Sequence, residues 1–250
     1  MIMTRIVILA AGKGTRMNSE LPKVLVPLNG RPMIKYLLEA VFASGVDNKP
    51  IVVASPDNKE IIKKELASYN LDYAIQDKQL GTGHAVACAQ SSLEQDGFKP
   101  DKVIILYGDH PAIKAESIKK FSQSNTGAVT IMPTKLQNYD DWRHNFYHWG
   151  RIIRRQDGQI EGIVEFKDAS EEIKKITEVN PGFMCFNYDW LFKNIHELKN
   201  NNSQGEYYLT DMVKIAFSEG LFIETIGIEA HEAMGVNSLE ELKIAERLLK

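Results

Sequence analysis

Short apolar runs alternate with helical patterns through the first half of the chain. The clearest helical pattern spans residues 33–44 and ends at Gly45, a residue that favours the left-handed end of a helix. The apolar runs contain few polar positions, as in strands buried on both faces of a parallel sheet. They lie at residues 5–10, 51–54, 103–106 and 128–132. This alternation predicts a doubly wound, Rossmann-like α/β sheet.

Weaker patterns complete this half. Asp57 is expected to cap a helix that runs to about Tyr69, residues 73–76 to form a short strand, and another helix to begin near Gly83. Ligands of doubly wound sheets bind at the carboxyl ends of the strands. A binding site is therefore expected in the loops after Leu9, Ile75 and Leu106.

The pattern of predicted strands and helices changes at residue 150. Residues 150–154 and 159–165 predict a hairpin turned by Asp157-Gly158, and residues 182–186 another strand. Helices are expected over residues 188–198, in a segment that ends at about Ser218, and after a capping box that begins at Ser238. No internal repeat or low-complexity linker interrupts the chain. We therefore expect one domain with two halves, residues 1–149 and a β-rich half with the last helix at 150–250.

Composition excludes several classes of function. The chain is 44% hydrophobic and 25% charged with a formal net charge of −3, so that a nucleic-acid-binding protein with a basic stripe is a poor match. Its two cysteines have no CxxC partner, which argues against a zinc site or redox pair. The first apolar run is too short for a signal peptide or membrane span, and we expect a cytoplasmic protein.

The segment from Leu9 to Met17 is the most informative loop. It lacks the lysine before Ser or Thr of a Walker A loop, and Met17 stands where a dinucleotide fingerprint has its third glycine. Small residues after a strand still leave backbone N–H groups free for an anion, and Arg16 and Lys23 add positive charge. The alternative is a surface turn with two solvated cations.

Other polar residues follow the predicted strands. The amide of Gln76 offers a donor and an acceptor to a base, but an amide can flip and cannot choose the base alone. Asp109 suits Mg²⁺, which binds through one or two protein oxygens plus phosphates. A helix cap is the alternative for Asp109, and a turn residue is the alternative for Asn237. His84 and His110 are interpreted as structural or rim residues, because neither has a second ligand at metal spacing.

Several segments together resemble the sugar-phosphate nucleotidyltransferase family. Within it, the chain is most similar to the uridyltransferase domains of bacterial bifunctional enzymes that make UDP-N-acetylglucosamine. The resemblance covers essentially the whole chain and implies a Rossmann-like mixed sheet with a sugar-side β-rich half. It rests on residues 9–17, 21–23, 76–85, 107–109, 150–152, 165–169, 204–211 and 235–237, which occur in the family's order.

The resemblance also implies roles for individual residues. Arg16 and Lys23 would be catalytic, and Asp109 and Asn237 would hold Mg²⁺ as the cofactor. The nucleotide, with uracil as its base, would bind at Leu9, Ala10, Ala11, Gly12, Gly14, Gln76, Gly81 and Thr82. The sugar would bind at Tyr107, Gly150, Glu165 and Asn180.

The implied reaction joins UTP and a sugar 1-phosphate, with N-acetylglucosamine 1-phosphate as the expected sugar. Alternatives are a transferase for another base or sugar, a metal-dependent glycosyltransferase, and a nucleotide-binding regulator without catalysis. Pro181 stands where the family has a threonine, which removes one N–H and one hydroxyl near the sugar and predicts weaker sugar selectivity. We expect no acetyltransferase β-helix, no nucleic-acid or membrane partner, and a monomer or dimer.

Overall fold

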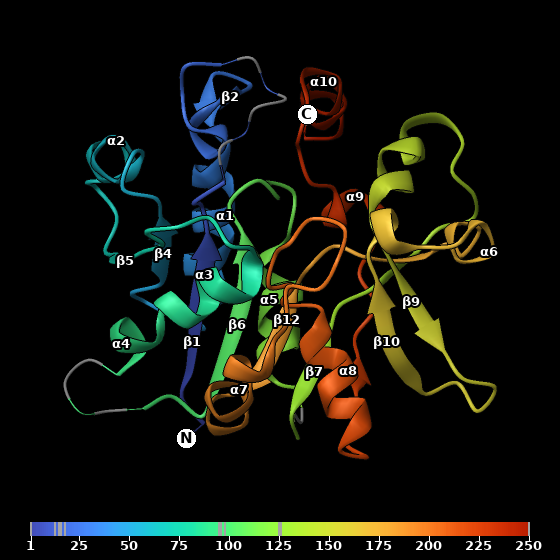
Figure 1. Cartoon of the computed structure of the whole chain (residues 1–250). Helices are drawn as coiled ribbons and strands as arrows, with labels where there is room; N and C mark the ends of the chain where they lie inside the picture. Colours follow the sequence, from blue (N-terminus) through green and yellow to red (C-terminus); the bar gives the residue numbers. More distant parts are fainter. Residues whose placement is uncertain are drawn as a thin grey trace.

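The computed structural model describes residues 2–12, 14, 17, 19–94, 97, 99–124 and 127–249. Across these residues the central sheet has seven strands in the order β13-β7-β12-β6-β1-β4-β5 (Figure 1). The strands are β1 (Thr4–Leu9), β4 (Ile51–Ala54), β5 (Asp72–Ile75), β6 (Lys102–Tyr107), β7 (Val129–Ile131), β12 (Met184–Asn187) and β13 (Glu224–Thr225). Only β12 runs antiparallel to its neighbours β6 and β7, so the described sheet is mixed.

Helices cover both faces of this sheet, because the strands are apolar on both sides. In β1, Ile6 and Ile8 pack in one cluster with α1 (Met33–Ser44) and α5 (Ala115–Ser122). Val7 and Leu9 point the other way, into a second cluster. That cluster includes residues of α3 (Thr82–Cys88), α4 (Gln90–Leu93), α7 (Tyr188–Asn194) and α8 (Asp211–Ser218). Two cores on opposite faces confirm the doubly wound arrangement.

A smaller sheet lies beside the central one and has the order β10-β9-β11-β8 (Figure 1). It consists of β8 (Thr134–Lys135), β9 (Gly150–Arg154), β10 (Ile160–Val164) and β11 (Glu178–Asn180). β9 and β10 form the hairpin expected around Asp157-Gly158. Its neighbours are η4 (Asp141–His148), η5 (Phe166–Asp168) and α6 (Glu171–Lys174).

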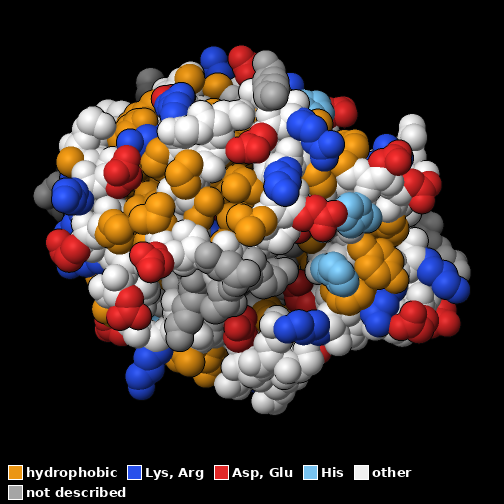
Figure 2. Space-filling view, turned by 90° about the horizontal axis from the view of Figure 1, so that it is seen from above, with side chains coloured by type: hydrophobic (Ala, Val, Ile, Leu, Met, Phe, Trp, Pro, Cys, Tyr) orange, Lys and Arg blue, Asp and Glu red, His pale blue; other side chains and the backbone are white. Residues whose placement is uncertain are grey.

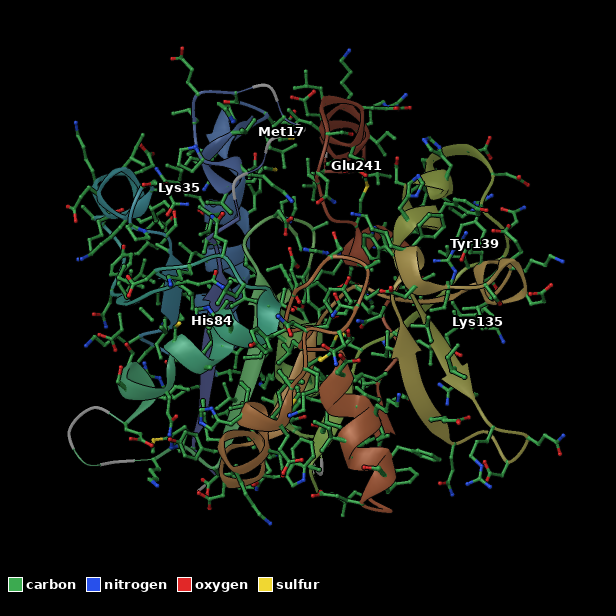
Figure 3. The ribbon with its side chains drawn as sticks, in the orientation of Figure 1. Met17, Lys35, His84, Lys135, Tyr139 and Glu241 are labelled. Carbon is green, nitrogen blue, oxygen red and sulfur yellow. The ribbon has the colours of Figure 1, made fainter. Side chains whose placement is uncertain are left out.

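The remaining short elements join these layers. They are η2 (Lys23–Leu25), β2 (Pro27–Leu28), β3 (Arg31–Pro32), α2 (Lys59–Glu65), η6 (Ile195–Glu197), α9 (Ala230–Ala233) and α10 (Leu239–Leu248). Figure 3 shows Met17, beyond the first loop, and Glu241, on α10, at the same upper end of the molecule. Met17 and α10 therefore lie at the same end of the molecule, whereas β1 begins at the opposite end (Figure 1).

Most element boundaries agree with the sequence predictions, and the exceptions have local causes. Helix α1 ends at Gly45, whose φ is 68°. The prediction that Asp57 caps a helix to Tyr69 is wrong: α2 begins after Asn58 and has no side-chain cap. The Asn58 amide instead accepts from Ser55 N at 2.8 Å and donates to Ala10 O at 3.1 Å, which ties two strand ends together.

Of two further expectations, the structure refines the first and confirms the second. The helix predicted over residues 188–198 is α7 followed by η6. Ser238 caps α10 by accepting from Glu241 N at 3.2 Å, as expected. The Glu241 carboxylate accepts from the N–H of Asn237, one residue before the capping serine.

No helix in the described part of the chain is long and apolar enough to cross a membrane. Seen from above, the end of the molecule toward which β1 runs carries Lys and Arg interspersed with Asp and Glu (Figure 2). That face shows no single basic stripe.

Candidate functional site

Two adjoining cavities open at the carboxyl ends of β1, β5 and β6. The first encloses about 540 Å³ and the second about 290 Å³. Both are lined by Thr82, Tyr107, Asp109, Glu206 and Asn237, so they meet along a common wall.

The predicted site residues that the structure describes all line these two cavities. The first contains Leu9, Ala10, Ala11, Gly12, Gly14, Lys23, Gln76, Gly81 and Thr82. The second contains Gly150, Glu165 and Asn180, and Tyr107, Asp109 and Asn237 border both. Arg16, a predicted catalytic residue, lies outside the described residues. The fold thus brings together residues that are more than 200 positions apart, such as Lys23 and Asn237.

One cation contacts two side-chain oxygens of the wall between the cavities. Lys23, on η2, donates from Nζ to Asn237 Oδ1 at 2.6 Å and forms an ion pair with Asp109 Oδ2. The backbone holds the two oxygen ligands together, since Val236 N donates to Asp109 O at 2.9 Å. Burial by itself would raise the pKa of Asp109, but the Lys23 ammonium and the His110 ring outweigh it and hold that pKa well below its usual range.

His110 holds the other oxygen of this carboxylate. Its Nδ1 lies 2.9 Å from Asp109 Oδ1, and an ionised carboxylate can only accept, so Nδ1 carries the proton. The ring packs edge-on against Phe183, with centroids 5.0 Å apart, and against Trp149. Its Nε2 is buried, and no described residue forms a hydrogen bond with it. The sequence interpretation was a structural or rim residue; in the structure His110 fixes the orientation of Asp109 and also lines the second cavity.

The first cavity is closed by a loop that must be glycine-rich. Tyr207 N donates to Leu80 O and Gly83 N donates to Tyr207 O, both at 2.8 Å. Gly81 has a φ of +106°, and a Cβ there would lie 2.7 Å from Tyr207 O. Any other residue would force the two backbones apart, which explains why residue 81 is glycine.

Two amide side chains line this cavity. Gln76 is 4% exposed and donates from Nε2 to Gly81 O at 2.9 Å. This bond fixes the amide, because a flipped amide would place its oxygen against the carbonyl. Gln79 donates from Nε2 to Ala11 O and so joins this loop to the first loop.

The second cavity carries a carboxylate and an amide suited to hydroxyl and carbonyl groups. Glu165 Oε1 accepts from Thr210 Oγ1 at 2.9 Å. Burial raises the pKa of Glu165, and the neighbouring Asp211 and Asp168 raise it further against the effect of Thr210. Asn180 Oδ1 accepts from Gly182 N at 3.1 Å, a turn that uses the amide oxygen. Burial also raises the pKa of Tyr107, so that its hydroxyl keeps its proton.

A divalent cation fits the Asp109 and Asn237 oxygens. They already converge on one positively charged atom, the Lys23 Nζ, which stands where a metal would find both ligands. In the described part of the chain no group of three or more His, Cys, Asp and Glu side chains could hold a metal. A pair of protein oxygens completed by phosphates and water is typical of Mg²⁺.

Several lining residues were not singled out from the sequence. Gln79, Glu206 and Thr210 lie inside the segments that carried the resemblance, and this position was their only signal. Arg151 is fully buried and donates to Tyr147 O at 2.7 Å and Lys174 O at 3.1 Å. It joins η4 to α6. From the sequence, an arginine in a predicted strand is expected to be exposed, so nothing indicated this buried structural role.

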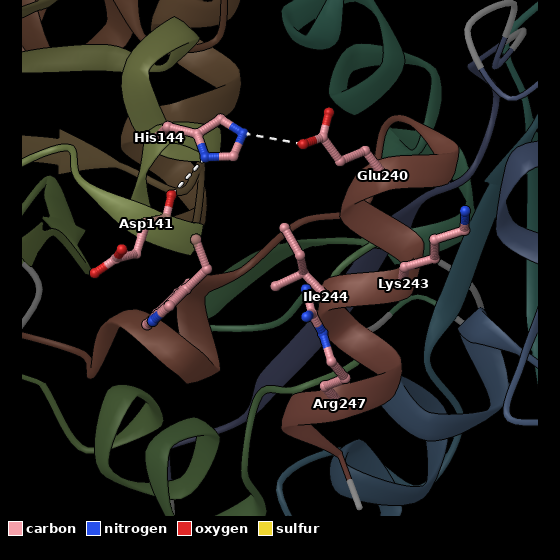
Figure 4. Close-up of a pocket in the computed structure, with 7 residues that line it drawn as sticks. Asp141, His144, Glu240, Lys243, Ile244 and Arg247 are labelled. Atoms are coloured by element: carbon pink, nitrogen blue, oxygen red, sulfur yellow. Dashed lines mark hydrogen bonds and ion pairs between the residues drawn. The ribbon is translucent and has the colours of Figure 1, made fainter.

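A third cavity lies outside this site, between η4 and α10 (Figure 4). It encloses about 500 Å³ and is lined by Asp141, Trp142, His144, Glu240, Lys243, Ile244 and Arg247. His144 Nε2 lies 3.5 Å from Glu240 Oε1 across it. The cavity contains none of the predicted site residues, and the contact of His144 with Glu240 joins η4 to α10.

Comparison with known proteins agrees with this geometry. Residues 6–206 match the MobA-like NTP transferase domain. The bifunctional protein GlmU of Caldicellulosiruptor saccharolyticus is 40% identical over 245 residues, 98% of this chain and 51% of that protein. The GlmU proteins of Clostridium kluyveri and Clostridium novyi are 39% and 38% identical, each over 98% of this chain and 52% of the relative. The chain spans about half the length of these relatives.

Proposed function

Because this chain belongs to the MobA-like NTP transferase family, we propose that it transfers a uridylyl group from UTP to N-acetylglucosamine 1-phosphate and releases pyrophosphate. One observation carries the proposal: a nucleotide-sized cavity and a smaller polar cavity meet at Asp109 and Asn237, and Lys23, which lines the first cavity, contacts both of these residues. Two substrates in these cavities would place their phosphates at the common wall. Charge neutralisation there is what phosphoryl transfer requires.

The chemistry needs no protein nucleophile. A phosphate oxygen of the sugar 1-phosphate attacks the α-phosphorus of UTP, a new P–O bond forms, and the bond to the β-phosphate oxygen breaks. Lys23 neutralises charge on the reacting phosphates, and we assign Arg16 to the triphosphate on sequence grounds. Asp109 and Asn237 would hold Mg²⁺, which would supply further positive charge. Asp109 stays ionised and acts as a ligand.

The first cavity is assigned to the nucleotide. Gln76 has its amide nitrogen engaged by Gly81 O, which leaves its oxygen as the acceptor for a donor on the base. Uracil offers N3–H, and cytosine offers its amino group, so this contact by itself accepts either base. Backbone groups at Ala11, Gly12 and Gly81 would complete the discrimination in favour of uracil.

The second cavity is assigned to the sugar. Glu165 would accept from sugar hydroxyls, and Asn180, with its oxygen bonded to Gly182 N, would donate from its amide nitrogen to the acetamido carbonyl. Gly150 would contribute its backbone N–H. Pro181 removes a donor beside Asn180, and we therefore propose a preference for N-acetylglucosamine 1-phosphate that is weaker than a threonine at this position would allow.

The test is release of pyrophosphate from UTP by the purified chain, with and without N-acetylglucosamine 1-phosphate and Mg²⁺. The proposal predicts release that needs all three components, with an equal amount of UDP-sugar formed. Tight UTP binding without turnover would refute it and favour a nucleotide-binding regulator.

A further inference from the structure

The ammonium of Lys23 occupies the position that the proposed metal needs. It bonds Asn237 Oδ1 at 2.6 Å and pairs with Asp109 Oδ2, so both oxygen ligands already face a cation. The three groups are largely buried, with side-chain exposures of 14% for both Lys23 and Asp109. His110 holds Asp109 Oδ1, which leaves Oδ2 as the oxygen that a cation can approach.

Lys23 and a divalent cation would compete for these oxygens. Mg²⁺ binds oxygen at about 2.0–2.1 Å and keeps an ordered shell of ligands around itself. An ammonium at hydrogen-bond distance from the same two atoms would enter that shell. Two cations at such a separation also repel each other strongly where little water screens them.

A second position is available to the Lys23 side chain. It lines the first cavity together with Gly12 and Gly14, where the proposed nucleotide would place its phosphates. A lysine side chain is a point charge on a flexible four-carbon stem and can change partners without a movement of the backbone. The Asp109 carboxylate has no such freedom, because His110 Nδ1 holds its Oδ1, and the bond from Val236 N to Asp109 O keeps the backbone before Asn237 beside it.

We propose that Lys23 is an internal competitor of the divalent cation. In the free enzyme it neutralises Asp109 and occupies both ligands, so that metal binding requires its displacement. This inference rests on the proposed function for the identity of its second partner, the nucleotide phosphates. Since the phosphates take Lys23 away from the ligands, nucleotide and metal bind with positive coupling.

The test measures metal binding without any nucleotide. Free Mn²⁺ is followed by electron paramagnetic resonance during titration of the wild type, Lys23→Met and Lys193→Met. Lys193 is an exposed residue of α7, at the opposite end of the molecule from the site, and its loss changes net charge by the same amount (Figure 1). Competition predicts that Lys23→Met binds Mn²⁺ at least about tenfold more tightly than wild type, and that Lys193→Met binds as wild type does.

Thermal unfolding gives a second readout that is independent of turnover. Without metal, Lys23→Met leaves Asp109 without its ammonium partner and should unfold at a lower temperature than wild type. Mg²⁺ should restore most of this loss and change the wild type much less. Lys23→Gln, also uncharged, carries the same expectation if the methionine variant folds poorly.

Equal Mn²⁺ affinity in wild type and Lys23→Met, or weaker binding in the variant, would overturn the inference, because Lys23 would then help to build the metal site. Absence of uridylyl transfer would refute the proposed function and would not alter these titrations, which contain no nucleotide.

Discussion

Gly235 lies against the ring of His110, and its replacement by alanine tests how Asp109 is held. A Cβ at residue 235 would lie 2.7 Å from His110 Nε2 and 2.8 Å from Cε1. Ordinary van der Waals contact begins at 3.4 Å, so that the ring or the backbone has to move by about 0.7 Å. The ring has little room to move, since Trp149 and Phe183 pack against it.

The expected cost follows from this overlap. Overpacking of a filled site costs about 1–3 kcal/mol, which for a chain of this size lowers Tm by about 2–12 °C. Movement of the ring also moves Asp109, the carboxylate that His110 Nδ1 bonds at 2.9 Å. A charged group displaced by most of an ångström costs on the order of 10–10²-fold in kcat/KM.

Thermal unfolding and the Mg²⁺ dependence of pyrophosphate release measure both effects. Gly227→Ala is the matched control, because a Cβ at this exposed glycine meets nothing within 4 Å. The double variant Gly235→Ala with His110→Ala should show a coupling of at least about 1 kcal/mol, because the overlap exists only while the ring is present. Wild-type Tm and Mg²⁺ dependence in Gly235→Ala would refute the idea that His110 and Gly235 position Asp109.

Three further outcomes are expected. Asp109→Ala and Lys23→Ala should each lower turnover on the order of 10²-fold or more, measured by pyrophosphate release, because Lys23→Ala removes positive charge from the proposed position of the reacting phosphates and Asp109→Ala removes a proposed ligand of Mg²⁺; near-normal rates would contradict the assignment. Burial raises the pKa of Glu165, so its carboxylate takes up a proton at a higher pH than an exposed glutamate. KM for the sugar 1-phosphate should therefore rise as pH falls through that pKa. The rise should be missing in Glu165→Gln, which is the control because the phosphate of the substrate titrates in the same way with both enzymes. Gly81→Ala should destabilise the chain by about 1–3 kcal/mol in denaturant unfolding, because its Cβ would overlap the Tyr207 backbone; an unchanged midpoint would show that the two loops separate easily.

Local signals predicted the elements of this fold well. Gly45 ends α1 in the left-handed conformation, and Asp157-Gly158 turns the β9–β10 hairpin, because both effects depend on a few neighbouring residues. The direction of β12 was not predictable from its own residues, since a short apolar strand can pair with its neighbours in either the parallel or the antiparallel direction. Helix α2 begins after Asn58 and not after Asp57. The Asn58 amide bonds Ala10 O, 48 positions away, and a contact over that distance has no local signal in the sequence.

The residues of the candidate site also divide into those with a local sequence signal and those that depend on contacts between distant segments. Residues with a recognisable loop context, such as Gln76 and Asp109, were identified as candidates, and the structure places them around two joined cavities. The bond from His110 to Asp109, the contact of His110 with Gly235 and the burial of Arg151 depend on packing between distant segments. So does the position of Lys23 between Asp109 and Asn237.

The central claim is tested most directly by kcat/KM of the purified chain for N-acetylglucosamine 1-phosphate, N-acetylgalactosamine 1-phosphate and glucose 1-phosphate, each with UTP, dTTP and CTP. The account predicts the highest value for UTP with N-acetylglucosamine 1-phosphate, with measurable use of the other sugars. Equal or better use of glucose 1-phosphate, or of CTP, would contradict the roles assigned to Asn180 and to the cavity around Gln76.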